Sequence, residues 1–299
     1  MMQPLQGSLV ALVTPMLENG SLDFNALEAL IEWHIESGTN GIVCVGTTGE
    51  SATVSVPEHL EIINKTINFV DGRVPVIAGT GGNSTQEAIE LTQTAAELRA
   101  DYALLVTPYY NKPNQEGLFQ HFIKIADSAE IPQILYNVPS RTACDLMPET
   151  VMRLANHQNI VGIKEALDSS ERLSELIKIS QSIADQKNFS VFSGDDPTFN
   201  SFMANGGDGV ISVAANVVPS YISQICSLNL SGQFDEAKEL NSILENLYEL
   251  LFVESNPIPV KWMLNRMKRI QSGIRLPLVP YNESFHEKTI NEMIKLKLL

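Results

Sequence analysis

The sequence predicts a (β/α)8 barrel followed by a C-terminal helical extension, and three observations lead to this class. Short apolar runs begin at residues 9, 42, 74, 103, 132, 160, 189 and 209. Helical patterns separate these runs, so the repeat is roughly 30 residues long, which is the length of a βα unit. Most of the runs are continuously apolar and do not alternate, as expected for parallel strands covered on both faces. Eight such units match a closed barrel.

Each expected element has a local signal. The strands are LVALVT, IVCVG, VPVIAG, ALLVT, PQILYN, IVGIK, FSVFSG and GVISV, in chain order. Capping-box patterns, or their Asp equivalent, predict helix starts at Ser55-x-x-Glu58, Ser84-x-x-Glu87 and Asp168-x-x-Glu171. Beyond about residue 230 the strand signal stops, and helices are expected over 233–254, 257–270 and 283–298. We therefore expect a barrel domain over 1–230 and a C-terminal helical domain over 231–299.

An open, doubly wound sheet is the alternative architecture, but its nucleotide-binding signatures are incomplete. The glycine-rich stretch 79–84 lacks the last glycine of GxGxxG, and Gly46 is followed by Thr47 where a phosphate-binding loop would carry lysine. The barrel is therefore the better match.

Composition and charge narrow the function classes. The chain has 299 residues, is 44% hydrophobic and carries a net charge of −15, so nucleic acid and anionic membranes are not expected partners. No apolar run reaches transmembrane length, and the start MMQPLQGS does not resemble a signal peptide. Three scattered cysteines and five scattered histidines form neither a disulfide framework nor a metal motif. We expect a soluble, cytoplasmic protein without a metal site.

The active site of a (β/α)8 barrel lies at the carboxyl ends of its strands. The residues expected there include Thr14, Thr47, Thr48, Tyr109, Tyr110, Tyr136, Asn137, Arg141, Lys164, Gly194, Asp195, Asp196 and Ile211. This set holds one amine, several hydroxyl groups and one guanidinium, but no histidine, cysteine or carboxylate cluster suited to a metal. It favours covalent chemistry by a lysine.

Lys164 ends the apolar run IVGIK. A lysine buried at a strand end has a lowered pKa, and its neutral amine can attack a ketone to form a Schiff base that acts as an electron sink. An ordinary lysine that reaches solvent from a strand end remains the alternative from position alone.

Three neighbours could assist Lys164, and each also has a simpler explanation. Tyr136 ends the adjacent strand and could exchange protons with the reacting amine together with Thr47, or it could be a core aromatic residue. The turn GTTGES could offer backbone N–H groups to a carboxylate, or it could be only a turn. Arg141 could bind a carboxylate with its guanidinium, or it could lie on a surface loop.

Five motifs together resemble the dihydrodipicolinate synthase family, which belongs to the pyruvate Schiff-base aldolase superfamily. They are GIVCVGTTGES (41–51), VTPYYNKP (106–113), LYNVPSRT (135–142), GIKEA (162–166) and SGDD…GGDGVISV (193–213). The resemblance covers essentially the whole chain in order, including the helical tail. It implies a lyase of lysine and diaminopimelate biosynthesis that condenses pyruvate with L-aspartate 4-semialdehyde, without a cofactor.

The resemblance also implies a role for individual residues. Lys164 would form the Schiff base, with Tyr136 linked through Thr47 to Tyr110 for proton transfer. Thr48 and the backbone of Gly194 and Ile211 would line the pyruvate pocket, and Arg141 would bind the carboxylate of the semialdehyde. Tyr110 would enter the site of a partner subunit, which makes a dimer the minimum active unit and a homotetramer, a dimer of dimers, the usual assembly.

Feedback inhibition by L-lysine is a further expectation from the resemblance. The corresponding positions are Ser51, Ala52, His59, Asn83, Glu87 and Tyr109. Val56 stands where the family often has histidine, and Glu87 could instead serve its capping box.

Two other functions remain as alternatives. N-acetylneuraminate lyase and 2-keto-3-deoxy-sugar-acid aldolases share the barrel, the GxxGE turn and the lysine; Tyr109-Tyr110 and the stretch PSRT over 139–142 favour the synthase instead. A non-catalytic metabolite-binding barrel would be expected to lack the lysine or the tyrosines, and all of them are present.

Overall fold

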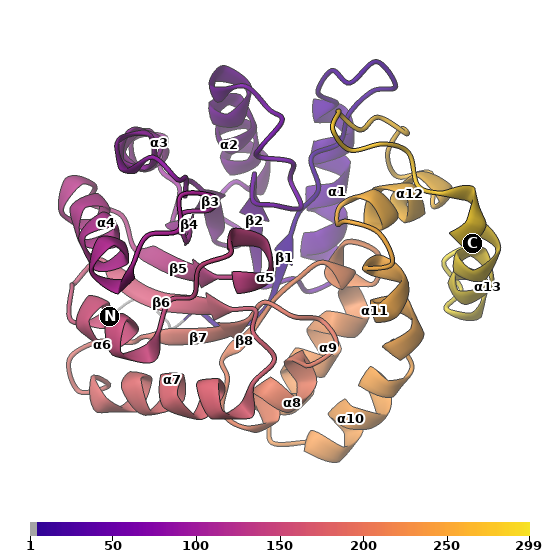
Figure 1. Cartoon of the computed structure of the whole chain (residues 1–299). Helices are drawn as coiled ribbons and strands as arrows, with labels where there is room; N and C mark the ends of the chain where they lie inside the picture. Colours follow the sequence, from indigo (N-terminus) through magenta and orange to yellow (C-terminus); the bar gives the residue numbers. More distant parts are fainter. Residues whose placement is uncertain (1–4) are drawn as a thin grey trace.

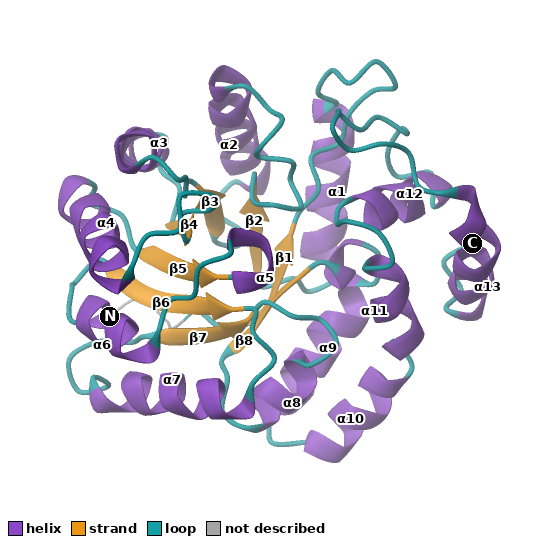
Figure 2. Cartoon of the chain, viewed as in Figure 1, coloured by secondary structure: helices purple, strands orange, loops and turns teal. Residues whose placement is uncertain are grey.

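A computed structural model describes residues 5–299, and its centre is a closed barrel of eight parallel strands (Figures 1 and 2). The strands are β1 (Gly7–Ala11), β2 (Gly41–Cys44), β3 (Val76–Gly79), β4 (Tyr102–Val106), β5 (Gln133–Asn137), β6 (Ile160–Glu165), β7 (Ser190–Ser193) and β8 (Gly209–Ser212). Each strand pairs with the next, and β8 pairs with β1 to close the barrel. The predicted fold class is confirmed.

Helices surround the barrel and continue into the C-terminal extension (Figure 1). Those around the barrel are α1 (Phe24–Glu36), α2 (Val56–Val70), α3 (Thr85–Glu97), α4 (Gln115–Ser128), α5 (Pro139–Thr142), α6 (Pro148–Ala155), α7 (Ser170–Ser182), α8 (Phe199–Ala204) and α9 (Pro219–Leu230). The later ones are α10 (Phe234–Ser242), α11 (Glu245–Leu251), α12 (Ile258–Arg266) and α13 (His286–Lys295). Short 3-10 turns, η1 (Ala214–Asn216) and η2 (Glu283–Phe285), complete the chain. Within residues 5–299, no helix has the length and apolarity needed to span a membrane.

Helix starts follow the predicted caps with one shift. The full capping box is present at Ser55 before α2, whereas at α3 the Ser84 hydroxyl accepts the N–H of Glu87 without the reciprocal bond. The prediction of Asp168 as the cap of α7 is wrong by one residue. Ser169 has the extended backbone of a cap, and its hydroxyl accepts the N–H of Arg172 at 3.2 Å.

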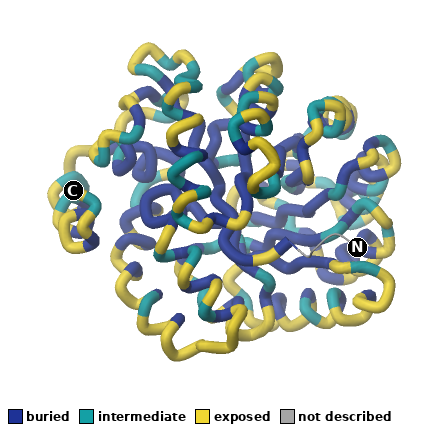
Figure 3. Tube along the Cα trace, turned by 180° about the vertical axis from the view of Figure 1, so that it is seen from behind, coloured by how far each residue is buried: buried dark blue, intermediate teal, exposed yellow. Residues whose placement is uncertain are grey.

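Side chains alternate between the inside of the barrel and the layer under the helices. Leu9, Val43, Ile77, Tyr136 and Ile211 belong to the cluster inside the barrel. Their neighbours along each strand point outward and pack against the helices. The strands are therefore buried on both faces, and the exposed residues lie on the outside of the molecule (Figure 3). The barrel interior is therefore a packed core, and the space for a ligand lies at its carboxyl end.

The single helix predicted over 233–254 is wrong, because α10 and α11 are separate. The backbone N–H groups of Ile243 and Leu244 bond to carbonyls three residues earlier, which ends α10. This turn lets Leu244 and Leu247 both reach a core cluster that also contains residues of β1 and α1. Within the extension, α10 lies beside α9 and α12 lies beside α1, whereas α13 lies at the edge of the molecule (Figure 1).

Candidate active site

A cavity of about 210 Å³ opens at the carboxyl ends of the strands. Its lining includes Thr47, Thr48, Tyr136, Arg141, Lys164 and Gly194, which were predicted from the sequence. The strands bring these residues together because β5 and β6 are in register at Tyr136 and Lys164, so both side chains point inward.

Among residues 5–299, Lys164 is the only lysine that lines this cavity, and it is just 5% exposed. Its Nζ lies 4.3 Å from the centre of the Tyr136 ring. Burial lowers the pKa of Lys164 to about 8, although the negative charge of Asp196 opposes this effect. A substantial fraction of the amine is thus neutral in mildly alkaline solution, as a nucleophile requires.

Gly194 makes room for the lysine side chain. A Cβ at this position would lie 2.9 Å from Cε of Lys164 and 2.9 Å from Cβ of Ala166. Ile211, in contrast, belongs to the cluster inside the barrel, and Val213 lines the cavity instead. Its predicted contact with pyruvate stays a prediction.

Tyr136 has a buried phenol beside the amine. Burial raises the pKa of Tyr136, and both the positive charge of Arg141 and a hydrogen bond with Thr47 oppose the rise. The phenol is therefore protonated at neutral pH and can donate its proton to a leaving hydroxyl group.

Asp196 holds the end of β8 near the lysine. Its buried carboxylate accepts the Ser212 hydroxyl at 2.5 Å and the N–H groups of Val213 and Ala214 at 3.0 and 2.9 Å. Burial raises the pKa of Asp196 to about 6. Its negative charge favours the protonated form of Lys164 and so opposes the effect of burial on that amine.

Arg141 lies on the short helix α5 and lines both this cavity and a larger one beside it. Thr142, the last residue of α5, is buried, and its hydroxyl accepts a hydrogen bond from the Thr107 hydroxyl at 3.2 Å. The guanidinium of Arg141 is exposed toward the cavities, where it can bind an anion from solution.

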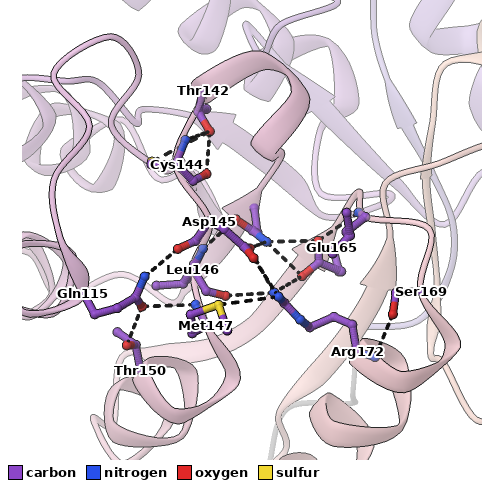
Figure 4. Close-up of polar contacts among 12 residues, drawn as sticks. Gln115, Thr142, Cys144, Asp145, Leu146, Met147, Thr150, Glu165, Ser169 and Arg172 are labelled. Atoms are coloured by element: carbon purple, nitrogen blue, oxygen red, sulfur yellow. Dashed lines mark hydrogen bonds and ion pairs between the residues drawn. The ribbon is translucent and has the colours of Figure 1, made fainter.

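Behind the site, a polar network joins the ends of β5 and β6 to α7 (Figure 4). The amide of Asn137 donates to Asp145 at 2.7 Å and to Glu165 at 3.0 Å. The guanidinium of Arg172 donates to Asp145 at 2.7 Å and to Glu165 at 3.4 Å. Asn137 and Glu165 directly follow Tyr136 and Lys164, so the network fixes the two strand ends on the face opposite the cavity.

The larger cavity, of about 410 Å³, contains most of the positions expected to bind lysine. Its lining includes Ser51, Ala52, His59, Glu87 and Tyr109, and Val56 as well. Asn83, the sixth predicted position, donates to the carbonyl of Tyr109 at 3.2 Å. His59 is buried and its Nε2 bonds the carbonyl of Gly79 at 2.8 Å.

Tyr110 lies outside both cavities. Its side chain is 91% exposed, and its backbone has a left-handed φ of 75°. The single chain therefore does not bring Tyr110 to Thr47, as proton transfer within one subunit would require.

The cavity lining also contains residues of the C-terminal extension that were not predicted from the sequence. Asn256 and Phe252 come from the segment between α11 and α12 and line the same cavity as Lys164. In the sequence Asn256 lies in the break between two predicted helices, far along the chain from every strand end, and no local pattern links it to the site. Within residues 5–299, no group of three or more histidine, cysteine, aspartate or glutamate side chains could hold a metal ion.

A buried amine, a phenol and a guanidinium in one cavity of a (β/α)8 barrel define a class: a barrel enzyme equipped to bind a carbonyl compound covalently. The model of the dihydrodipicolinate synthetase family matches residues 4–296. The chain belongs to this family. A 4-hydroxy-tetrahydrodipicolinate synthase of Teredinibacter turnerae is 57% identical over 281 residues, covering 94% of this chain and 95% of the relative.

Solved structures agree with the relatives. The chloride-inhibited dihydrodipicolinate synthase of Acinetobacter baumannii, in complex with pyruvate, is 51% identical with a TM-score of 0.95, covering 99% of this chain and 100% of that one. The enzyme of Cyanidioschyzon merolae with lysine bound is 36% identical with a TM-score of 0.93, covering 99% and 100%. The predicted family and enzyme class are confirmed, and the sugar-acid aldolase alternative is not favoured.

Proposed function

We propose that the chain condenses pyruvate with L-aspartate 4-semialdehyde through a Schiff base on Lys164, which gives 4-hydroxy-tetrahydrodipicolinate, the first committed product on the route to diaminopimelate and lysine. The observation that carries this proposal is the buried amine of Lys164, with a pKa lowered to about 8, between a phenol and a guanidinium. The family membership of the chain supports the same reaction.

Pyruvate binds first in this proposal. The neutral amine of Lys164 attacks the carbonyl carbon of pyruvate, and the resulting carbinolamine loses water to form an imine. Tyr136 donates the proton that the leaving hydroxyl group needs, with Thr47 hydrogen-bonded to its phenol. In this proposal the carboxylate binds to the Thr48 hydroxyl, which is buried and lines the cavity, and to adjacent backbone N–H groups.

Condensation follows at the methyl carbon of pyruvate. Loss of a proton from this carbon converts the imine into an enamine, which attacks the aldehyde carbon of the semialdehyde. The amino group of the semialdehyde then attacks the imine carbon, closes the ring and releases Lys164, so that one water molecule is lost overall. Arg141 binds the carboxylate of the semialdehyde with its exposed guanidinium.

Peptide mapping by mass spectrometry after treatment with pyruvate and borohydride tests the proposal. We expect one reduced pyruvyl adduct, on the peptide that carries Lys164, and none in the Lys164→Met variant. Product formation should then require aspartate semialdehyde as the acceptor and should be negligible with sugar aldehydes. An adduct scattered over surface lysines, or its absence, would rule out the Schiff base.

Tyr110 completes the site of a second subunit in this proposal. Its 91% exposure in the single chain supports a position at a subunit interface, since a large exposed aromatic side chain on a left-handed backbone has no packing role here. A dimer would then be the smallest active unit, and two dimers would form the homotetramer.

L-Lysine is proposed as a feedback inhibitor that binds in the larger cavity. The carboxylate of Glu87 suits an ammonium group, and the phenol of Tyr109 and the amide of Asn83 suit a carboxylate. Steady-state rates with and without millimolar L-lysine, in the wild type and in Glu87→Gln, test this site. Equal wild-type rates with and without lysine would exclude it.

We also propose that the enzyme acts in the cytoplasm. Its three cysteines, Cys44, Cys144 and Cys226, are all free, as expected in a reducing compartment. Fractionation of cells that express the full chain tests this location.

A further inference from the structure

The strongest unassigned feature of the cavity is a side chain from the C-terminal extension. Asn256 is 6% exposed and lines the same cavity as Lys164 and Thr48. Its Nδ2 donates to the Thr48 hydroxyl oxygen at 3.0 Å, across 208 residues of sequence. Its Oδ1 is buried and has no hydrogen-bond partner among residues 5–299.

We propose that Asn256 is a positioning residue, which orients the Thr48 hydroxyl toward the carboxylate of pyruvate and so gives the C-terminal extension a part in substrate binding. This inference rests on the proposed function, in which Thr48 contacts pyruvate. A hydroxyl group has one hydrogen and two lone pairs. Because the amide of Asn256 already occupies one lone pair, the hydrogen of Thr48 remains free to be donated to the substrate.

The place of Asn256 in the cavity supports a functional role, because its buried side chain lines the same cavity as Lys164 and donates to Thr48, whereas the equally buried Asn229 lines no part of this cavity. A buried polar atom without a partner costs stability, and an apolar side chain at this position would avoid that cost. At Asn256 this cost is accompanied by a hydrogen bond to a residue of the cavity, which an apolar side chain could not make. Orientation of a substrate-binding hydroxyl group would explain an asparagine here.

The C-terminal extension makes a second contact with the turn that contains Thr48. Glu50, two residues after Thr48, is buried and has a left-handed backbone with φ of 57°. The ammonium of Lys261 on α12 forms a buried ion pair with its carboxylate, which also accepts the N–H of Arg275 at 3.2 Å. The extension thus contacts the pyruvate-binding turn at both Thr48 and Glu50.

Asn256→Ala in the full chain is the first variant to measure. The pyruvate concentration that gives half-maximal borohydride trapping should rise about 10-fold, the effect of one lost buried hydrogen bond. The KM for the semialdehyde and kcat should change by less than about 2-fold, and the melting temperature should fall by no more than a few degrees, as expected for one lost hydrogen bond.

Asn256→Asp tests whether the hydrogen-bond donor of Asn256 matters or only the shape of its side chain. The carboxylate has the size of the amide but cannot donate, so it takes the hydrogen of Thr48 and repels the carboxylate of pyruvate. We expect weaker pyruvate binding than in Asn256→Ala. A role in packing alone would instead make the isosteric Asp the milder change.

Asn229→Ala is the matched control. Asn229 on α9 is also 6% exposed, and its Oδ1 is likewise unpartnered within residues 5–299, but its Nδ2 contacts Asn200 and Ile225 away from the site. Pyruvate trapping should be unchanged. In addition, Asn256→Ala should have no further effect on pyruvate binding in a Thr48→Val background.

Several results would overturn the inference. These are wild-type pyruvate binding in Asn256→Ala or Asn256→Asp, equal shifts in Asn256→Ala and Asn229→Ala, or additive effects with Thr48→Val. Failure of the proposed function is distinguishable, because the wild type itself would then form no pyruvate adduct at Lys164.

Discussion

Lys164 is both buried and ionisable, and burial is unfavourable for the charged form of its amine. Its side chain packs over Gly194 and beside Tyr136, where an ammonium group is poorly solvated. The proposed function explains why the protein retains this amine, since its neutral form would be the nucleophile. Two measurable consequences follow, one for reactivity and one for stability.

The rate of adduct formation with pyruvate should rise with pH through about 8. Burial lowers the pKa of Lys164 to about 8, so the amine is mostly protonated below this pH and mostly neutral above it. Well below pH 8 the initial trapping rate should increase about tenfold per pH unit, and above pH 8 it should level off. Trapping from pH 6 to 9.5 measures this, and a rate that is flat from pH 6 to 8 would contradict the assignment.

Lys164→Met should stabilise the fold at pH 7. The lowered pKa means that the charged amine is less favourable in the folded state, and this cost is complete below about pH 8 and disappears toward the unfolded pKa of 10.5. The free energy of unfolding in urea should rise by about 1–3 kcal/mol at pH 7, with a smaller gain at pH 10.5.

Lys178→Met is the control for this stability measurement, since Lys178 lies exposed on α7 and its loss should change stability by less than about 0.5 kcal/mol. If Lys164→Met were less stable than the wild type at both pH values, the amine would instead be stabilised by its surroundings.

The sequence predicted which residues come together where the strand ends meet, and their roles stay predictions. Thr47, Thr48, Tyr136, Arg141 and Lys164 line one cavity because parallel strands and their following loops converge at the carboxyl end. Asn256 could not be found this way. Its contact with Thr48 depends on how the extension packs against the barrel, and no local pattern encodes a contact across 208 residues.

At the scale of elements, the polar network of Asn137, Asp145, Glu165 and Arg172 holds the ends of β5 and β6 in place. Arg172→Met would leave the carboxylates of Asp145 and Glu165 without their shared guanidinium. Removing one partner of a buried charge cluster typically costs about 3–5 kcal/mol, so we expect a loss of that order at pH 8.

The loss should be smaller at pH 5. Burial raises the pKa of Glu165 to about 7, so this carboxyl is mostly protonated at pH 5 and needs no positive partner there. Urea unfolding at both pH values measures the difference. Arg153→Met is the control, because its ion pair with Glu116 is exposed and should contribute less than about 1 kcal/mol. Equal losses in the free energy of unfolding for the two variants would show that the network does not stabilise the fold more than an exposed ion pair does.

Element boundaries were predicted less well than element types. All eight strands lie where apolar runs indicated, yet the helix over 233–254 is divided and the cap of α7 is displaced to Ser169. Helical periodicity continues across Ile243 and Leu244, so only the packing of Leu244 and Leu247 against the barrel reveals the break.

At the scale of the whole molecule, the extension is continuous with the barrel core. One cluster contains Val10 and Ile31 of the barrel together with Leu247 and Val260 of the extension. We therefore propose that the segment 231–299 does not unfold independently of the barrel over 1–230. The extension also contacts Thr48 and Glu50, so under the proposed role of Asn256 this continuity would affect substrate binding.

Assembly is tested by mixing two inactive variants. Lys164→Met removes the proposed nucleophile, and Tyr110→Phe removes the phenol that is proposed to transfer protons. If Tyr110 acts in the partner subunit, a mixed dimer contains one complete site: Lys164 comes from one chain and Tyr110 from the other. Random mixing makes half of the dimers mixed, and half of their sites complete, so activity should recover to about 25% of the wild-type value.

The alternative arrangement gives a different result. If Tyr110 served its own chain, neither chain of the mixture would hold a complete site, and mixing would restore nothing. The 91% exposure of Tyr110 means that Tyr110→Phe should leave the fold intact, which unchanged melting would verify. Sedimentation of the mixture identifies the species that carries the recovered activity. Recovery confined to a species of two or more subunits would make the dimer the functional unit, whereas full activity of Tyr110→Phe alone would remove this tyrosine from the mechanism.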